Sequence, residues 1–427
     1  MMDRKRITIY LAAAAVVLGA VLLITSSGRD KPSSEALSGG VNDWICNELS
    51  DTADLSGMDK KIALYMQQWQ LKGLSLSVMR GDSLLYAKGY GWADEEKGEK
   101  MQPSHLLRIA SVSKLVTAAG IMVLCEQCKL SLADTVFGPR GLLPEYSGVI
   151  KDRNYYKITV EDLLRHKAGF TVRGGDPMFS TRTIMRVNNL EAPPTNEELA
   201  RIVLARKLGY LPGTSQSYSN FGFMLLGLII EKVSAQSYED FIQENVLRPA
   251  GCVDFHIAGN YPGDAHKGEV HYYVPVNETL VPEYNCSGDS VVRCYGGNDI
   301  RALGGAGAWV ASTPEIARFV SAIDGRGVLP DIISQKSVDA MVEYFDKETY
   351  SLGWNDTEPS SGWTRSGTFS GTSALVKYFP DGECWVMVTN TSTWKGPGFS
   401  RYTAGLFRAL REGWSDKLPA RNLFEKQ

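Results

Sequence analysis

Hydrophobic and polar positions follow two different periods along the chain, and the changes of period outline a fold. Residues 58–69 place Met58, Ile62, Tyr65, Met66 and Trp69 at helical spacing on one face, which predicts an amphipathic helix. Two β-rich runs within residues 74–94, joined by a polar turn at 80–83, predict a hairpin. A second pair of such runs surrounds a Pro-Asp-Gly turn late in the chain, at residues 373–379 and 383–390.

Between the hairpins the pattern is helical. A mostly apolar helix is expected from near Ser111 to about Cys128, and residues 159–162 resemble a capping box that opens a short helix. Residues 221–234 are apolar on nearly every face, so this helix is expected to be buried. The order of elements predicts an α+β fold, an α/β sandwich in which an antiparallel sheet flanked by helices carries a helical insertion lobe.

An apolar run at residues 7–25 follows three basic residues at positions 4–6. At about 1.5 Å per residue it matches the hydrocarbon thickness of a bilayer, and the charges favour a cytoplasmic N-terminus. We expect a signal anchor that leaves the rest of the chain facing the periplasm or the cell exterior, with a cleaved signal peptide as the alternative. The expected boundaries are 1–25 for this segment, 26–56 for a tether, 57–412 for one folded unit of two lobes and 413–427 for a C-terminal tail.

Composition and charge exclude two classes of protein. The 427 residues are 44% hydrophobic, and 45 Lys and Arg nearly balance 48 Asp and Glu, for a formal net charge of −3. A largely disordered chain lacks this apolar content, and a protein that coats nucleic acid needs concentrated positive charge. The composition therefore indicates a globular protein with no nucleic-acid partner.

The pair Ser111 and Lys114 is the first candidate for chemistry. Residues three apart share one face of a helix, so the hydroxyl and the ammonium can touch. Free N–H groups at the first helical turn could stabilise an oxyanion, and burial would lower the pKa of the lysine towards that of a useful base. The alternative is an ordinary serine at the N-terminus of a helix, followed by a lysine that snorkels to the surface. The same Ser-x-x-Lys pattern recurs at residues 392–395, which we interpret as coincidence.

Tyr218 and Asn220 form a second candidate, in the only Tyr-x-Asn of the chain. Residues two apart in an extended segment project to one side, so the phenol and the amide could line one pocket. A tyrosine there can relay protons and an asparagine can hold a substrate amide. The alternative is a turn residue followed by an N-cap, because a helix begins at this point.

With these motifs the sequence resembles the class C β-lactamase and DD-peptidase family of penicillin-recognising serine hydrolases. The resemblance covers about residues 57–412, nearly all of the part expected to be exported. Several ordered motifs are more specific than any one of them alone. They are GLSLSV (73–78), GYGWAD (89–94), RIASVSK (108–114), KLSLADTV (129–136), ITVEDLLRHKAGF (158–170), YSNFGFMLLGLIIEKVS (218–234), GGAGAWVASTPEIARF (304–319) and YSLGW (350–354).

The resemblance implies a role for each candidate residue. Ser111 would be the acylated nucleophile, and Lys114 and Tyr218 would jointly manage the protons. Asn220 would contact the substrate amide. No metal or cofactor is implied.

The chain departs from the family at the triad that normally begins with Lys or His. The corresponding residues are Arg365, Ser366 and Gly367, and Arg keeps the positive charge in a planar fork that suits a carboxylate. Gly367 would leave room for substrate beside the strand, and the backbone N–H groups of Thr368 and Ser111 would form the oxyanion hole. The alternative places Arg365 on an exposed strand face.

Together these features predict an exported serine hydrolase that forms an acyl-enzyme on amide, lactam or ester bonds. The expected substrate is a small molecule or a peptide that bears a carboxylate, and Arg365 is expected to bind that group. The alternative is a catalytically silent module that binds or senses peptidoglycan fragments or β-lactams, favoured only by the altered triad.

Overall fold

The computed structural model describes residues 40–173, 175–326 and 330–426. The apolar run at residues 7–25 and the first part of the expected tether lie outside this range. Within the described ranges, no helix combines the length and the apolar character needed to cross a membrane.

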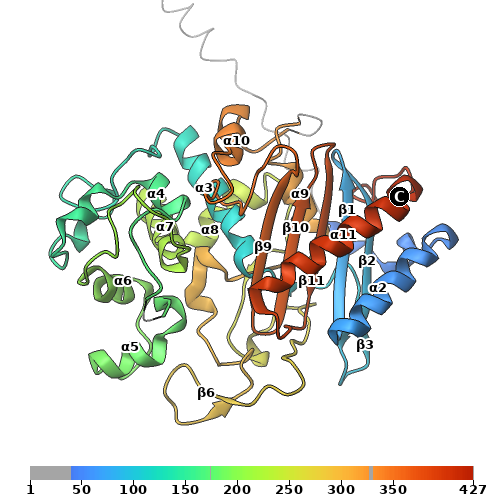
Figure 1. Ribbon diagram of the computed structural model, residues 1–427, viewed down its shortest axis with the longest axis horizontal. Helices are drawn as coiled ribbons and strands as arrows, with labels where there is room; N and C mark the ends of the chain where they lie inside the picture. Colours follow the sequence, from blue (N-terminus) through green and yellow to red (C-terminus); the bar gives the residue numbers. More distant parts are fainter. Residues whose placement is uncertain (1–39, 174, 327–329, 427) are drawn as a thin grey trace, which may run out of the picture. The chain divides into compact units, whose positions relative to one another are not determined.

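The two predicted hairpins lie in one antiparallel sheet with the strand order β3-β2-β1-β11-β10-β9 (Figure 1). β1 pairs with β11 along its length, so the first and the last hairpin meet at the centre of the sheet. This sheet and its helices confirm the predicted α+β fold. The strands are β1 (Gly73–Arg80), β2 (Ser83–Asp94), β3 (Glu99–Lys100), β9 (Trp363–Phe369), β10 (Thr372–Tyr378) and β11 (Glu383–Thr389).

Helices cover both faces of this sheet. Helices α2 (Ser56–Trp69) and α11 (Ser400–Trp414) lie side by side across one face, and α9 (Thr313–Ser321) packs on the other (Figure 1). β1 shows the alternation that this requires, because Leu76 belongs to the core under α2 and α11 while Ser75 and Ser77 face α9. The hydroxyls of Ser75 and Ser77 lie 2.7 and 2.9 Å from Oγ1 of Thr313, so these buried polar groups are satisfied.

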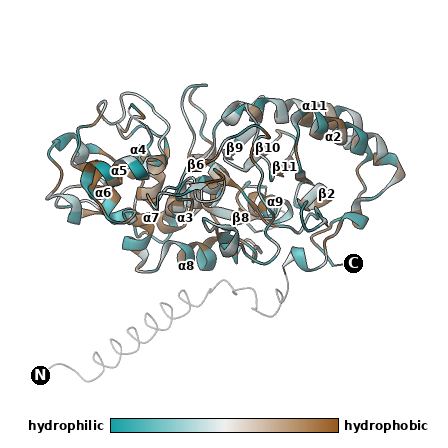
Figure 2. Cartoon of the chain, turned by 90° about the horizontal axis from the view of Figure 1, so that it is seen from below, coloured by the Kyte–Doolittle hydropathy of each residue, from teal (hydrophilic) through white to brown (hydrophobic). Residues whose placement is uncertain are grey.

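The helical lobe is built around α3 and α7, which lie side by side in Figure 2 and pack against each other. Most of their side chains are buried. Both predicted apolar helices are therefore confirmed. The predicted capping box is confirmed as well, because Thr159 and Asp162 exchange hydrogen bonds at the start of α4. The helices of this part are α3 (Ser113–Glu126), α4 (Val160–Leu164), α5 (Thr181–Asn188), α6 (Asn196–Leu204), α7 (Asn220–Ser234), α8 (Tyr238–Ile242) and, later in the chain, α10 (Gln335–Val342).

The structure moves both expected boundaries of the folded unit. Residues 40–55 contain three short 3-10 helices rather than a tether, and Val41 and Ile45 are buried in the main core. At the other end, Leu423 and Phe424 join the same core, and the N–H of Leu423 donates to the carbonyl of Leu84. The sequence did not predict that these two segments join the core, because each contributes only a few apolar residues among polar ones.

Glu383, at the start of β11, ties the sheet to α11. Its carboxylate accepts hydrogen bonds from Arg80 (2.7 Å) and Arg411 (2.8 Å), and also from Trp385 and Ser415. Burial alone would raise the pKa of Glu383, but these four donors lower it from its ordinary value of 4.5 to about 2.

We predict that Glu383→Gln destabilises the protein by about 1–3 kcal/mol near neutral pH, since two arginines lose a charged partner. Because the folded pKa lies below the unfolded value, this stabilisation is complete above about pH 4.5 and is lost as the pH falls towards 2. Thermal unfolding of both proteins across this range should show Tm values that converge at low pH. Glu412→Gln, an exposed position on α11, is the control, and a pH-independent gap would contradict the prediction.

Candidate active site

Ser111 lies in a 3-10 turn (Ala110–Val112) that joins the short strand β4 (Leu107–Arg108) to α3. The turn is tight, and Ala110 adopts a left-handed φ of 48°. On one side of the turn, the N–H of Ile109 donates to the carbonyl of Trp309 in β8 (Trp309–Ala311) at 3.0 Å. On the other side, Oγ of Ser113 accepts from the N–H of Trp309 at 3.2 Å. The backbone of the nucleophile candidate is thus held between two contacts to one strand.

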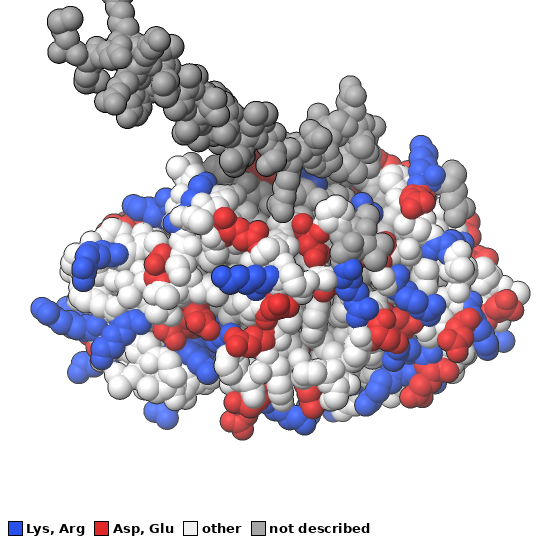
Figure 3. Space-filling model, turned by 90° about the horizontal axis from the view of Figure 1, so that it is seen from above, with Lys and Arg blue, Asp and Glu red and all other residues white. Residues whose placement is uncertain are grey.

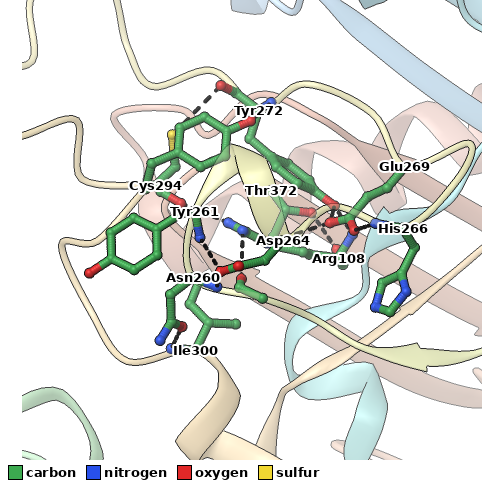
Figure 4. A network of polar contacts seen from close by, with 12 residues as sticks. Arg108, Asn260, Tyr261, Asp264, His266, Glu269, Tyr272, Cys294, Ile300 and Thr372 are labelled. Atoms are coloured by element: carbon green, nitrogen blue, oxygen red, sulfur yellow. Dashed lines mark hydrogen bonds and ion pairs between the residues drawn. The ribbon is translucent and has the colours of Figure 1, made fainter. Parts of the chain in front are cut away.

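A buried polar network fixes the strand that precedes this turn (Figure 4). The Arg108 guanidinium donates to the carbonyls of Cys294 (2.7 Å) and Gly259 (3.0 Å). The backbone N–H of Arg108 donates to the Tyr272 hydroxyl, and Thr372 donates to the Arg108 carbonyl. Contacts from four residues that lie at least 151 positions away in the chain therefore position the residues just before Ser111.

Lys114 is fully buried, and its ammonium has three acceptors. Nζ donates to Oγ of Ser111 at 3.2 Å, to Oδ1 of Asn220 at 2.7 Å and to the carbonyl of Ala306. Burial, together with the charge of Arg365, lowers the pKa of Lys114 from 10.5 to about 8. The expected contact between Ser111 and Lys114 is present.

Tyr218 approaches Ser111 from the segment before α7. Its hydroxyl donates to Oγ of Ser111 at 2.7 Å. Burial alone would raise the pKa of Tyr218, but the cations of Lys114 and Arg365 lower it from 10 to about 8. Oγ of Ser111 therefore contacts two groups, the Lys114 amine and the Tyr218 phenol, that exchange protons near the same pH.

His166 packs against the ring of Tyr218 and is uncharged. Its ring centroid lies 4.4 Å from that of Tyr218, and Nδ1 accepts from the N–H of Ser219 at 3.1 Å. Burial, with the neighbouring cations, lowers the pKa of His166 well below its ordinary value, so the ring stays neutral at pH 7.

Asn220 lies beside Lys114, and both ends of its amide are engaged. Oδ1 accepts from Lys114, and Nδ2 donates to the carboxylate of Asp176 at 2.8 Å. Asp176 therefore orients the amide so that its oxygen faces the ammonium. Asp176 was not predicted from the sequence. Its one local signal is that it caps a 3-10 turn, where it accepts from the N–H of Met178.

Arg365 on β9 is buried, with 1% of its surface exposed, so the alternative of an exposed strand face is wrong. Nε donates to the carbonyl of Ser111 at 2.6 Å, and Nη2 donates to the Tyr218 hydroxyl at 3.1 Å. Nη1 is buried as well and has no hydrogen-bond partner among the described residues. Arg365 thus contacts the reacting residues themselves, whereas the sequence predicted a contact to substrate.

Gly367 allows β9 to approach the turn that carries Ser111. A Cβ atom at this position would lie 2.4 Å from the carbonyl oxygen of Ile109 and 2.7 Å from the nitrogen of Ser111. The missing side chain makes room for the nucleophile's own backbone, whereas we expected it to make room for substrate.

Ser366 and Thr368 lie on the free edge of β9. The N–H of Ser366 donates to Oδ1 of Asn355 at 2.7 Å, and the N–H of Thr364 donates to the carbonyl of Asp356 at 2.8 Å, so even-numbered N–H groups point away from β10. The two-residue period of a strand places the N–H of Thr368 on the same edge. Asn355 was not predicted, since it lies outside the family motifs.

A cavity of about 430 Å³ opens beside Ser111. It brings together all the predicted site residues except Lys114 and Arg365, which lie behind its wall. Its lining consists of Ser111, Phe179, Tyr218, Asn220, Leu303, Ala306, Gly307, Tyr350, Asn355, Ser366, Gly367, Thr368, Phe369 and Pro397.

We predict that Gly367→Ala lowers stability by about 1–3 kcal/mol, because the new methyl group forces β9 away from the Ser111 turn. Thermal or urea unfolding measures the change. Gly148→Ala is a matched control, since nothing lies within 4 Å of a Cβ there and the glycine is exposed. Equal stability of the two variants would show that the close approach does not constrain the fold.

The chain is similar in sequence or in fold to several known proteins. The chain is 27% identical over 348 residues to penicillin-binding protein 4* of Bacillus subtilis (strain 168), covering 76% of this chain and 69% of that protein. It is 29% identical over 192 residues to protein flp of Staphylococcus aureus (strain N315), covering 45% of this chain and only 36% of flp. The solved structure of a D-amino acid amidase from Ochrobactrum anthropi SV3 with D-phenylalanine has the same fold, with a TM-score of 0.65 at 19% identity over 84% of this chain and 99% of the amidase.

The Beta-lactamase family model matches residues 58–409, a span that contains every residue of the site described above. Because this match covers well over half of the 427 residues, the chain belongs to the beta-lactamase family.

Proposed function

We propose that this protein is a serine hydrolase that forms an acyl-enzyme through Ser111 on amide, lactam or ester substrates. One observation carries the proposal: Oγ of Ser111 is hydrogen-bonded at once to Nζ of Lys114 and to the hydroxyl of Tyr218, beside an open cavity. A hydroxyl nucleophile needs such an adjacent proton acceptor, because it is weak at its own pKa.

Acylation begins when Oγ of Ser111 attacks the substrate carbonyl and its proton passes to the Lys114–Tyr218 pair. The N–H groups of Ser111 and Thr368 would stabilise the oxyanion that forms. When the bond to the leaving group breaks, the proton is returned from the pair to the departing nitrogen or oxygen. Water then attacks the acyl-enzyme and gives a proton to the Lys114–Tyr218 pair. The pair returns this proton to Oγ of Ser111 as the acid is released.

Arg365 assists this proton transfer through Tyr218. Its Nη2 donates to the phenol oxygen, and that bond is strongest when the oxygen is a phenolate. Arginine stays charged throughout the pH range, so it lowers the pKa of the phenol without taking part in the transfer. In this proposal Arg365 is a positioning and electrostatic residue, and Asn220 and Asp176 hold Lys114 in place.

The relatives support hydrolysis of small amide substrates or of related bonds. The amidase with the same fold binds D-phenylalanine, and one curated relative is a penicillin-binding protein. We propose substrates among D-amino-acid peptides, β-lactams and small esters, since shared acylation chemistry does not separate these classes.

We also propose that the hydrolase acts outside the cytoplasm, either anchored in the membrane or secreted. The support is the apolar run at residues 7–25 behind three basic residues. The similarity to a penicillin-binding protein supports a location of this protein in the cell envelope.

Covalent labelling with a fluorophosphonate or a fluorescent penicillin tests the nucleophile. We expect labelling of the wild-type protein, loss of labelling in Ser111→Ala, and a fall in kcat of about a thousandfold or more. Ser392→Ala, in the second Ser-x-x-Lys sequence, is the control and should keep its label. Reversible binding of penicillin without covalent labelling would instead support the silent binding module, and labelling that survives Ser111→Ala would move the nucleophile elsewhere.

The charge of Arg365 should set the pH dependence of acylation. The Lys114–Tyr218 pair must release a proton to act as a base, and its pKa near 8 places the lower limb of the rate profile there. Arg365→Gln removes a cation, so both pKa values rise and the limb should move to higher pH by about one unit. Arg365→Lys retains the charge and should move it less. A limb that stays in place or moves to lower pH in Arg365→Gln would contradict this role.

A further inference from the structure

The cavity beside Ser111 is lined without charge. Of the described residues, those that form its wall include no Lys, Arg, His, Asp or Glu. The outer surface differs, because Lys and Arg alternate with Asp and Glu across the face seen in Figure 3. A charged group that lies within this cavity would therefore meet only neutral polar groups, aromatic rings and aliphatic side chains.

The two cations behind the wall offer no donor to the cavity. The three N–H donors of Lys114 go to Ser111, Asn220 and Ala306. Arg365 uses Nε and Nη2 on the carbonyl of Ser111 and on the phenol of Tyr218. Its remaining nitrogen, Nη1, is buried without a partner among the described residues, and Arg365 does not belong to the cavity lining.

Their positive charge instead acts on the reacting atoms. Both cations lie against Ser111 and Tyr218, where an alkoxide, a phenolate or an oxyanion develops during acylation. A carboxylate on the leaving group would give up its hydration without gaining an ion pair of good geometry, which is unfavourable.

Asn355 supplies a neutral donor at this wall. Its Oδ1 accepts from both the backbone N–H of Ser366 (2.7 Å) and the Ser366 hydroxyl (3.2 Å). Because an N–H group must face an acceptor, these contacts fix the orientation of the amide. Nδ2 therefore points away from Ser366 and is the donor that Asn355 can offer to a ligand.

We propose that this cavity selects substrates with an uncharged leaving group, such as carboxamides and neutral esters, and that Nδ2 of Asn355 donates to a carbonyl oxygen of that group. The inference rests on the proposed function, since it concerns the same Ser111 site. It replaces the carboxylate-bearing substrate predicted from the sequence, which depended on Arg365 facing the cavity. The aromatic side chains of Phe179, Tyr350 and Phe369 in the cavity lining also suit an apolar or neutral polar group.

Two matched esters test the inference on the wild-type protein. N-acetyl-D-alanyl-D-lactate and N-acetyl-D-alanyl-D-lactamide share one scissile ester, and their leaving groups differ only in ending in a carboxylate or in an uncharged carboxamide. Their short acyl group limits contact with a neighbouring cavity that shares Phe179 and is lined by Arg182 and Arg293. We expect kcat/KM for the lactamide to exceed that for the lactate by about tenfold or more, measured by chromatography of the released alcohols.

The outcomes separate this inference from the proposed function. Equal turnover of the two esters, or a preference for the lactate, overturns the inference while leaving the Ser111 hydrolase intact. If neither ester is hydrolysed and a fluorophosphonate fails to label Ser111, the proposed function fails and the inference fails with it.

Asn355→Asp probes the donor directly. The carboxylate keeps the two acceptor bonds to Ser366, but it replaces the neutral donor with a negative charge. We expect kcat/KM to fall by about tenfold for the lactamide and by about a hundredfold for the lactate, so the ratio between them widens. Asn355→Ala removes the donor without adding charge and should lower both values while leaving their ratio nearer to that of the wild type. An unchanged ratio in Asn355→Asp would overturn the role given to Asn355.

Discussion

Strand β9 and the 3-10 turn that carries Ser111 approach each other so closely that only a glycine fits between them. A Cβ at Gly367 would overlap the carbonyl of Ile109 and the nitrogen of Ser111. The contact joins the sheet to the helical lobe at the point where the chemistry is proposed. It also lets Arg365, two residues before Gly367 on the same face of β9, reach the carbonyl of Ser111 and the hydroxyl of Tyr218.

The electrostatics of the site follow from this approach. Lys114 and Arg365 are both buried, and the Tyr218 phenol lies beside them with a pKa of about 8. Burial weakens the basicity of Lys114 while the second cation weakens it further, and the same two charges favour the phenolate. The result is a proton-accepting pair around one hydroxyl, with two cations that contact the reacting residues but do not belong to the cavity lining.

Local spacing predicted much of the fold and part of the site. The hairpins, the apolar helices α3 and α7 and the capping box at Thr159 follow from periodicity and from residue type over a few positions. The contact between Ser111 and Lys114 could be foreseen for the same reason, since residues three apart on a helical turn are neighbours. Spacing also indicated Tyr218 and Asn220 as candidates, and the family motifs added the roles of these residues and the triad that begins at Arg365, because several ordered motifs identify relatives whose fold is shared.

The remaining features depend on partners that are distant in the sequence. The direction of Arg365 depends on how closely β9 approaches the Ser111 turn, a contact between residues 254 positions apart. Asp176 contacts Asn220 and Asn355 contacts Ser366, and nothing in the sequence near Asp176 or Asn355 indicates those contacts. The sequence by itself determined the elements and the nucleophile pair, because these depend on local spacing. Only the tertiary structure decided that Lys114 and Arg365 lie outside the cavity lining, because their positions depend on how side chains from separate elements pack in one buried space.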